Sequence, residues 1–333
     1  MSPVAGSDRS TTEQAARRLG DRARRQVPLA GYTTYRVGGP ASVLVELDGP
    51  DDVAALAAVV GETGVATLVV GRGSNLLVAD AGFDGVAVVL GEGFSGIRIG
   101  GTEGGQAGAG PGERVIVRAG GGASLPVVAR QSAAAGLTGF EWAVGVPGSV
   151  GGAVRMNAGG HGSDMAASLV RVRVLDLSTG EDGWVPADRL RLSYRHSSIR
   201  PSQVVLEAEL ALDRGDRARS EATIAEIVRW RRQHQPGGPN SGSVFTNPPG
   251  DSAGRLIEAS GAKGLRRGSA QVSTKHANFI QVDEGGRAAD VVELMVEVRD
   301  RVEQATGVRL VPETCLVGFD DPSGNPQVLI EGR

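Results

Sequence analysis

Residues 69–77 read VVGRGSNLL, and residues 144–159 read VGVPGSVGGAVRMNAG. Both segments pass from an apolar run into glycine, serine and other small residues. Small residues let successive backbone N–H groups face an anion such as a pyrophosphate, although a tight turn also favours Gly and Asn. One anion held from both sides explains two such loops better than two unrelated turns. We therefore expect a phosphate-containing ligand between them.

The segments around these loops predict an α+β organisation. The cluster PGGPNSG at residues 236–242 breaks the helical pattern and reads as a domain boundary. Runs rich in β-branched residues predict strands at residues 43–47, 67–71, 86–90, 114–120 and 170–177. Capping signals and apolar spacing predict helices at residues 52–60, 125–136, 221–232 and 290–306.

Length and composition exclude several classes of protein. The 333 residues suffice for two or three domains. A net charge of −3 argues against a nucleic-acid partner, because neutralising phosphates needs a basic surface. With one cysteine, Cys315, and four dispersed histidines, the chain offers no disulfide and no recognisable metal site. We expect any redox chemistry to depend on an organic cofactor.

The N-terminal residues 1–27 are rich in arginine and lack the apolar core of a signal peptide. We expect them to form a flexible extension. No later stretch approaches the ~20 apolar residues that cross a bilayer. The sequence therefore predicts a cytoplasmic protein with no membrane partner.

Residues 91–112 form a glycine-rich, low-complexity segment that we expect to be an extended hairpin loop. Gly91, Gly93 and Gly96 formally match GxGxxG. A dinucleotide fingerprint must follow a strand and open a helix, whereas the IRI that follows here reads as a strand. We reject a Rossmann fold on this ground.

Seven motifs in order carry a resemblance to a known family. They are TTYRVGGPA (33–41), GRGSNLLVADAGF (71–83), GVPGSVGGAVRMNAGGHG (145–162), LSYRHSSI (192–199), SGSVFTNP (241–248), KHANFI (275–280) and PETCLVGF (312–319). Together they resemble the UDP-N-acetylenolpyruvoylglucosamine reductases, in the branch that lacks an inserted tyrosine-bearing loop.

The resemblance implies a fold and a reaction. The fold is a two-subdomain FAD-binding unit of the vanillyl-alcohol-oxidase type followed by an α+β substrate domain. We assign residues 28–92 and 93–213 to the two subdomains and residues 214–333 to the substrate domain. The implied reaction is NADPH-dependent reduction of UDP-N-acetylglucosamine enolpyruvate to UDP-N-acetylmuramate through non-covalent FAD. We expect a monomer.

The resemblance also implies site residues. The implied FAD-binding residues are Arg36, Gly71, Arg72, Gly73, Ser74, Asn75, Leu76, Gly145, Pro147, Gly148, Ser149 and Gly151. The implied substrate-binding residues are Tyr194, Asn247, Lys275 and His276. The implied catalytic residues are Arg195, Ser243 and Glu313.

The reaction explains why these three catalytic residue types are needed. Hydride addition to the enolpyruvyl methylene leaves negative charge beside the substrate carboxylate, and the carbon then needs a proton. Arg195 would stabilise the negative charge that develops on the substrate. Glu313 would orient the Arg195 side chain or share a proton with the enol oxygen, and Ser243 would protonate the carbon. Without the resemblance, these residues read as a surface arginine, a turn hydroxyl and a carboxylate after proline.

Three positions depart from the family pattern. Thr246 stands where a lysine usually precedes Asn-Pro, and His161 stands where a tyrosine is usual. The segment before Gln235 and Pro236, where a lysine is common, offers Arg231 and Arg232 and no lysine. The diphosphate contacts therefore cannot all be transferred. Two alternatives stay open: another FAD-dependent sugar or hydroxy-acid oxidoreductase on this scaffold, or an inactive flavin-binding protein.

Overall fold

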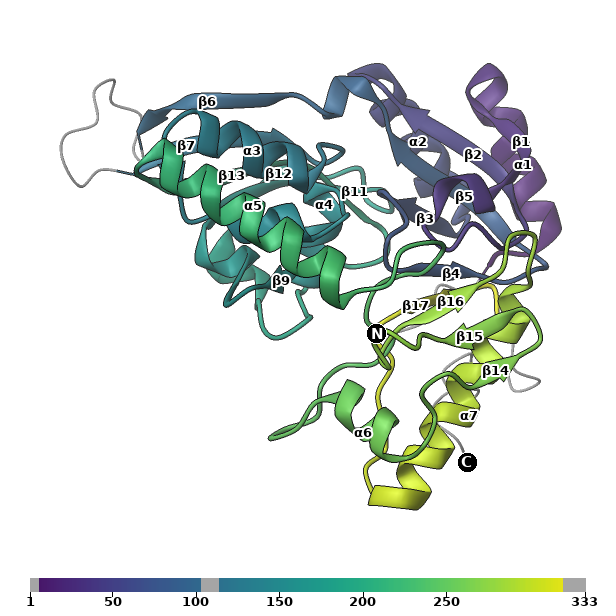
Figure 1. The fold of residues 1–333 in the computed structure, drawn as a ribbon. Helices are drawn as coiled ribbons and strands as arrows, with labels where there is room; N and C mark the ends of the chain where they lie inside the picture. Colours follow the sequence, from purple (N-terminus) through teal and green to yellow (C-terminus); the bar gives the residue numbers. More distant parts are fainter. Residues whose placement is uncertain (1–5, 103–113, 320–333) are drawn as a thin grey trace.

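The computed structural model describes residues 6–102 and 114–319. It contains two sheet-based subdomains and a C-terminal domain. In Figure 1 the second subdomain, mostly teal but with the green helix α5 and the blue strand β6, lies on one side, and the first subdomain (purple and blue) and the C-terminal domain (green to yellow) lie on the other. The α+β prediction is confirmed. The tip of the loop expected at residues 91–112 lies outside the described residues.

The first subdomain is a four-stranded sheet in the order β1-β2-β5-β3. Strand β1 is antiparallel to β2, whereas β5 runs parallel to both β2 and β3. The elements are α1 (Arg9–Leu19), η1 (Gly20–Arg22), β1 (Arg24–Pro28), η2 (Leu29–Tyr32), β2 (Pro40–Leu47), α2 (Pro50–Thr63), β3 (Thr67–Val70), β4 (Leu76–Val78), β5 (Phe83–Leu90) and η3 (Glu92–Phe94). The three strands predicted here are confirmed as β2, β3 and β5.

The second subdomain is an antiparallel sheet with β13 near its centre, in the order β12-β11-β13-β7-β6. Its elements are β6 (Ile97–Thr102), β7 (Val115–Gly120), α3 (Leu125–Ala134), β8 (Leu137–Thr138), η4 (Glu141–Gly145), α4 (Val150–Met156), β9 (Gly159–Gly160), β10 (Ser163–Asp164), η5 (Met165–Ala167), β11 (Leu169–Asp176), β12 (Asp182–Pro186), η6 (Ala187–Leu190), β13 (Gln203–Arg214) and α5 (Arg217–His234). The pairing of β6 with β7 agrees with a strand, not a helix, after the rejected GxGxxG.

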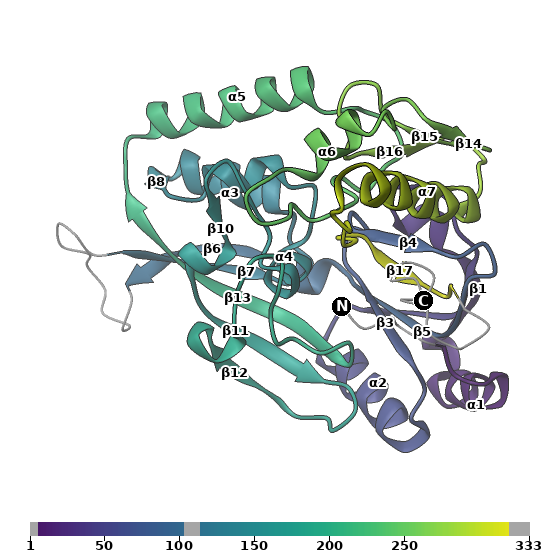
Figure 2. The same ribbon diagram turned by 90° about the horizontal axis from the view of Figure 1, so that it is seen from below.

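The C-terminal domain packs helix α7 against a small antiparallel sheet, β14-β15-β16. Its last strand, β17, pairs in parallel with β4 of the first subdomain (Figure 2). The chain thus returns to the first subdomain after the third unit is complete. The elements are α6 (Ala253–Ala259), β14 (Arg266–Arg267), β15 (Ala270–Val272), β16 (Ile280–Val282), α7 (Ala288–Thr306) and β17 (Cys315–Val317).

Apolar side chains join the units. Leu175, Val204 and Leu206 of the second subdomain share a buried cluster with α1 and α2. Tyr35, Val37 and Leu77 of the first subdomain lie in the core of the C-terminal domain. The three units therefore meet over buried apolar surface. In the described part of the chain, no helix has the length and apolar character needed to cross a membrane.

Two of the predicted boundaries are wrong. Residues 9–28 form α1 and β1 instead of a flexible extension, and Ala15, Ala16 and Leu19 are buried. Their apolar face was hidden in an arginine-rich composition. Helix α5 packs through Ile224 and Ile227 into the core of the second subdomain, so a C-terminal domain beginning at residue 214 starts one helix too early. The breaker cluster at residues 236–242 fits the observed boundary better.

Replacing Leu19 with alanine tests whether α1 belongs to the folded core. Leu19 is 3% exposed, so the change should cost about 2 kcal/mol or more and lower the urea midpoint of unfolding. Gln14→Ala, on the exposed face of the same helix, is the control. Equal midpoints for the two variants would mean that α1 does not pack on the sheet.

Candidate active site

A cavity of about 780 Å³ lies where the two glycine loops face the C-terminal domain. It brings together most of the residues that the sequence singled out. Those lining it are Gly71, Arg72, Gly73, Ser74, Asn75, Leu76, Gly145, Pro147, Gly148, Ser149, Arg195, Ser243 and Glu313. The predicted cofactor loops and the predicted catalytic residues therefore share one chamber.

A second cavity of about 330 Å³ adjoins the first. Gly151, another predicted cofactor residue, lines this smaller cavity. Six residues line both cavities and so mark their junction: Val69, Gly71, Arg72, Ser149, Gly152 and Arg155. The junction is thus built from both glycine loops.

In the first glycine loop, Gly71 and Gly73 lie so close to neighbouring protein atoms that neither position has room for a side chain. A Cβ on Gly71 would lie 2.3 Å from Ser149 Oγ. A Cβ on Gly73, whose φ is +59°, would lie 2.0 Å from the carbonyl oxygen of Tyr32. A pyrophosphate can approach the backbone only where no side chain intervenes. The loops therefore fit the phosphate portion of a dinucleotide such as FAD.

Five predicted binding residues line neither cavity. Arg36 and Asn247 are exposed, and Asn247 Oδ1 accepts a hydrogen bond from the amide of Ala253. Tyr194 is 58% exposed, with its ring beneath the Arg195 guanidinium. Lys275 Nζ donates to the carbonyl oxygen of Arg232. His276 is half-buried, and its amide donates to Ser273 Oγ.

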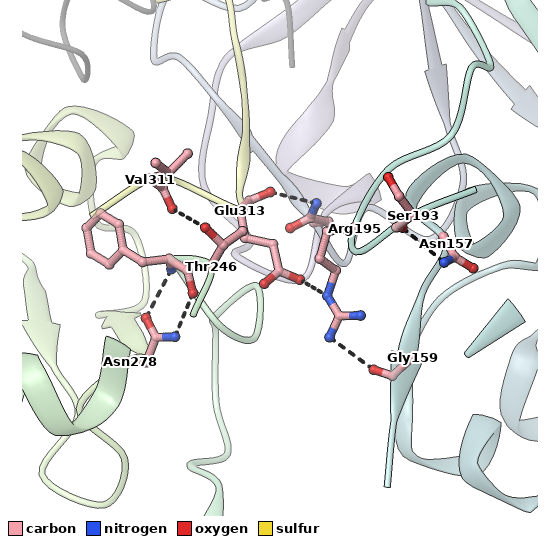
Figure 3. Close-up of polar contacts among 10 residues, drawn as sticks. Asn157, Gly159, Ser193, Arg195, Thr246, Asn278, Val311 and Glu313 are labelled. Carbon is pink, nitrogen blue, oxygen red and sulfur yellow. Dashed lines mark hydrogen bonds and ion pairs between the residues drawn. The ribbon is translucent and has the colours of Figure 1, made fainter. Parts of the chain in front are cut away.

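Arg195 and Glu313 form an ion pair across the cavity wall (Figure 3). The distance from Arg195 Nε to Glu313 Oε1 is 2.7 Å, and Arg195 Nη2 donates to the carbonyl oxygen of Gly159 at 3.1 Å. Arg195 has a φ of +55°, a left-handed conformation that costs free energy in a residue with a side chain. The surrounding contacts hold it there and aim its guanidinium at Glu313.

Burial raises the pKa of the Glu313 carboxyl, and the charge and hydrogen bond of Arg195 oppose this shift. A carboxyl with a raised pKa can exchange a proton at a pH closer to neutrality than an exposed glutamate can. The pair thus combines a fixed positive charge with a group capable of proton exchange. Such a pair can stabilise a developing negative charge and exchange a proton with a bound ligand.

The backbone of Glu313 is held by the first subdomain and by its own C-terminal domain. Asn75 Nδ2, in the first glycine loop, donates to the Glu313 carbonyl oxygen at 3.0 Å. The Glu313 amide donates to the Val244 carbonyl oxygen at 2.7 Å, beside Ser243. The ion pair with Arg195 gives Glu313 a contact with the second subdomain as well. Glu313 therefore touches all three units.

Two buried asparagines position the catalytic segments. Asn157 Nδ2 donates to the Ser193 carbonyl oxygen at 3.0 Å and so fixes the turn that carries Arg195 (Figure 3). The side chain of Asn278 bonds to both the amide and the carbonyl oxygen of Phe245, two residues after Ser243. Both asparagines lie inside the motifs that carried the resemblance, but a one-dimensional pattern does not reveal a positioning role.

Other cavity residues were not predicted as ligands. Arg155 belongs to α4, and Arg231 to the last turn of α5. Arg231 donates to the Gly145 carbonyl oxygen and, from Nε at 2.6 Å, to Gln235 Oε1. It therefore holds the second glycine loop. The sequence indicated only that this segment has Arg231 and Arg232 where the family commonly has a lysine. It could not show which way the Arg231 side chain points.

Replacing Gly73 with alanine should disrupt the anion cradle. The new Cβ would collide with backbone, whereas Gly64→Ala adds a Cβ at a similar φ of +65° with nothing within 4 Å. We expect the first variant, but not the second, to lose most of its affinity for FAD while remaining folded. Equilibrium titration of the apoproteins with FAD measures this. Equal affinities would show that the first loop does not contact the cofactor.

Comparisons with known proteins agree with this geometry. A family model described as an FAD-binding domain matches residues 41–182. A second, for the C-terminal domain of UDP-N-acetylenolpyruvoylglucosamine reductase, matches residues 233–317. The second match begins just before the breaker cluster, which supports placing α5 with the second subdomain.

Relatives of the whole chain carry the same description. The UDP-N-acetylenolpyruvoylglucosamine reductase of Rubrobacter xylanophilus is 40% identical, with 87% of this chain and 94% of the relative covered. UDP-N-acetylenolpyruvoylglucosamine reductase 2 of Symbiobacterium thermophilum is 40% identical, with 96% of this chain and 98% of the relative covered. The crystal structure of the Thermus caldophilus reductase superposes with a TM-score of 0.73 at 34% identity, covering 89% and 99%. The chain belongs to the UDP-N-acetylenolpyruvoylglucosamine reductase family.

Proposed function

We propose that this protein reduces UDP-N-acetylglucosamine enolpyruvate to UDP-N-acetylmuramate, a step in peptidoglycan precursor synthesis, with NADPH as reductant and FAD as cofactor. The observation that carries the proposal is the Arg195–Glu313 ion pair in the same cavity as Ser243 and both glycine loops. Family membership disfavours a different flavin oxidoreductase. An inactive flavin-binding protein would have no need of this charged arrangement.

The two glycine loops would hold FAD. Bound there, FAD supplies two-electron transfer between NADPH and the substrate. We propose that the attachment is non-covalent. Cys315, the one cysteine of the chain, lines the cavity, but burial raises the pKa of its thiol and so disfavours the nucleophilic thiolate.

Arg195 would bind the carboxylate end of the enolpyruvyl group. A guanidinium stays protonated at all relevant pH values and donates in a fork that matches a carboxylate. Its Nε is already committed to Glu313 and one Nη to Gly159, so its orientation is set before substrate arrives. A charge that need not reorganise stabilises a developing enolate more effectively than water does.

Ser243 would deliver the proton to carbon. Its neighbour Val244 is held on both sides, because the Val244 amide donates to Asn278 and the Val244 carbonyl oxygen accepts from Glu313. These two bonds hold the backbone next to Ser243, which lines the same cavity as the ion pair. A serine is a weak acid, but carbanion character at the substrate carbon makes the transfer favourable where water is excluded.

One cavity would serve both NADPH and the UDP-sugar in turn. A separate nicotinamide-binding fold is not recognisable in the sequence, and the described cavity of about 780 Å³ opens onto the catalytic pair. We also propose that the enzyme acts as a monomer in the cytoplasm, without nucleic-acid or membrane partners. The net charge of −3 is consistent with this setting.

Ser243→Ala separates the two half-reactions. Flavin reduction by NADPH should stay near the normal rate, because it needs no proton on the substrate carbon. Flavin reoxidation by the enolpyruvyl sugar should slow by roughly 100-fold or more, the size of a general-acid contribution. Stopped-flow absorbance of the flavin follows both steps. Equal slowing of both would make Ser243 a structural residue.

Arg195→Ala and Glu313→Gln test whether the ion pair acts on one intermediate. Each should slow flavin reoxidation, with Arg195→Ala lowering turnover more than substrate affinity. Since both residues act on the same charge, the double variant should be much less impaired than the product of the single losses. Single-turnover rates of flavin reoxidation for the unaltered protein, the two single variants and the double variant give the coupling free energy between the two residues. Strictly multiplicative losses would remove at least one of the two residues from the mechanism.

A further inference from the structure

Arg155 is a cationic side chain that the proposed chemistry does not use. It lies near the end of α4 and lines both cavities at their junction. Five other residues share that position: Val69, Gly71 and Arg72 from the first glycine loop and Ser149 and Gly152 from the second. Arg155 therefore lies where both loops approach the same point.

The charge of Arg155 has no acidic counterpart in the described residues, where Asp and Glu form ion pairs with other cations but not with this one. Its guanidinium instead donates a long hydrogen bond of 3.4 Å from Nη1 to the Arg200 carbonyl oxygen. Cys315 lies close by, but its thiol stays neutral because burial raises its pKa. Withdrawing a guanidinium from water without an anion is costly. The site therefore favours an anionic ligand.

The other arginines at this cavity are already committed or exposed. Arg195 pairs with Glu313, and Arg231 bonds to Gly145 and Gln235. Arg72 is exposed. Arg155 is thus a half-buried cation that is still available to an anion at the junction.

The shape of the two cavities indicates which anion this is. A dinucleotide has two bulky ends joined by a pyrophosphate, and here a cavity of about 780 Å³ joins one of about 330 Å³ at a junction of glycine loops. We propose that Arg155 binds the pyrophosphate of FAD at this junction, neutralising charge that the backbone N–H groups alone would leave. The inference rests on the proposed function, because it takes the ligand to be FAD.

The test is equilibrium binding of FAD and of riboflavin to apoprotein, followed by flavin fluorescence. Arg155→Gln should weaken FAD binding by roughly 10- to 100-fold, as expected for one lost hydrogen bond to a charged group. Riboflavin has no phosphate, so its affinity should not change. Arg155→Lys, which keeps the charge, should retain part of the FAD affinity. Arg130→Gln, on the exposed face of α3, is the matched control.

The outcomes separate this inference from the proposed function. Unchanged FAD affinity in Arg155→Gln would overturn the inference while leaving the reductase assignment intact. Equal weakening of FAD and riboflavin would also overturn it, since Arg155 would then contact the flavin ring. If Arg155→Gln fails to fold, the affinities of Arg155→Lys and of the unaltered protein for FAD and riboflavin are compared instead, and the same criteria apply. An unaltered apoprotein that binds no FAD would contradict the proposed function itself.

Discussion

The position of Glu313 is the constraint on which the site depends. Its carboxylate meets Arg195 of the second subdomain, its carbonyl oxygen meets Asn75 of the first, and its amide meets Val244 of the C-terminal domain. The parallel pairing of β17 with β4 makes this possible, because it brings the end of the chain back beside the first glycine loop. A change at any of the three units would therefore displace the carboxylate.

The contacts between the units include both apolar packing and polar bonds, and the two kinds have different consequences. The C-terminal domain is fixed to the first subdomain by apolar packing around Tyr35, whose burial raises its pKa to about 12. Two of its contacts with the second subdomain are polar: Arg195 with Glu313 at the cavity, and Lys275 with the carbonyl oxygen of Arg232 outside it. Apolar burial is non-directional, whereas ion pairs and hydrogen bonds set angles. The first holds the domains together, and the second orients the reacting groups.

Much of this could be predicted from the sequence, for identifiable reasons. Strands and helices followed from β-branched runs and apolar spacing, and the glycine loops from small residues after a strand. The family resemblance, not the pattern alone, indicated Arg195, Ser243 and Glu313, which line one cavity, but it could not give side-chain direction across domains. Tyr194, Asn247, Lys275 and His276 therefore belong to the right segments and still line neither cavity. Helix α1 was missed because Leu19 is the one large apolar side chain among its buried residues, and the segment around it is rich in arginine.

The central claim is that one cavity, built from three units, serves NADPH and the enolpyruvyl sugar in turn. Initial rates of NADPH oxidation over a matrix of both concentrations test it most directly. The account predicts that oxidation requires UDP-N-acetylglucosamine enolpyruvate and that each ligand at high concentration inhibits by competing with the other. Oxidation that proceeds equally without the sugar, or saturation by each ligand with no mutual competition, would contradict it.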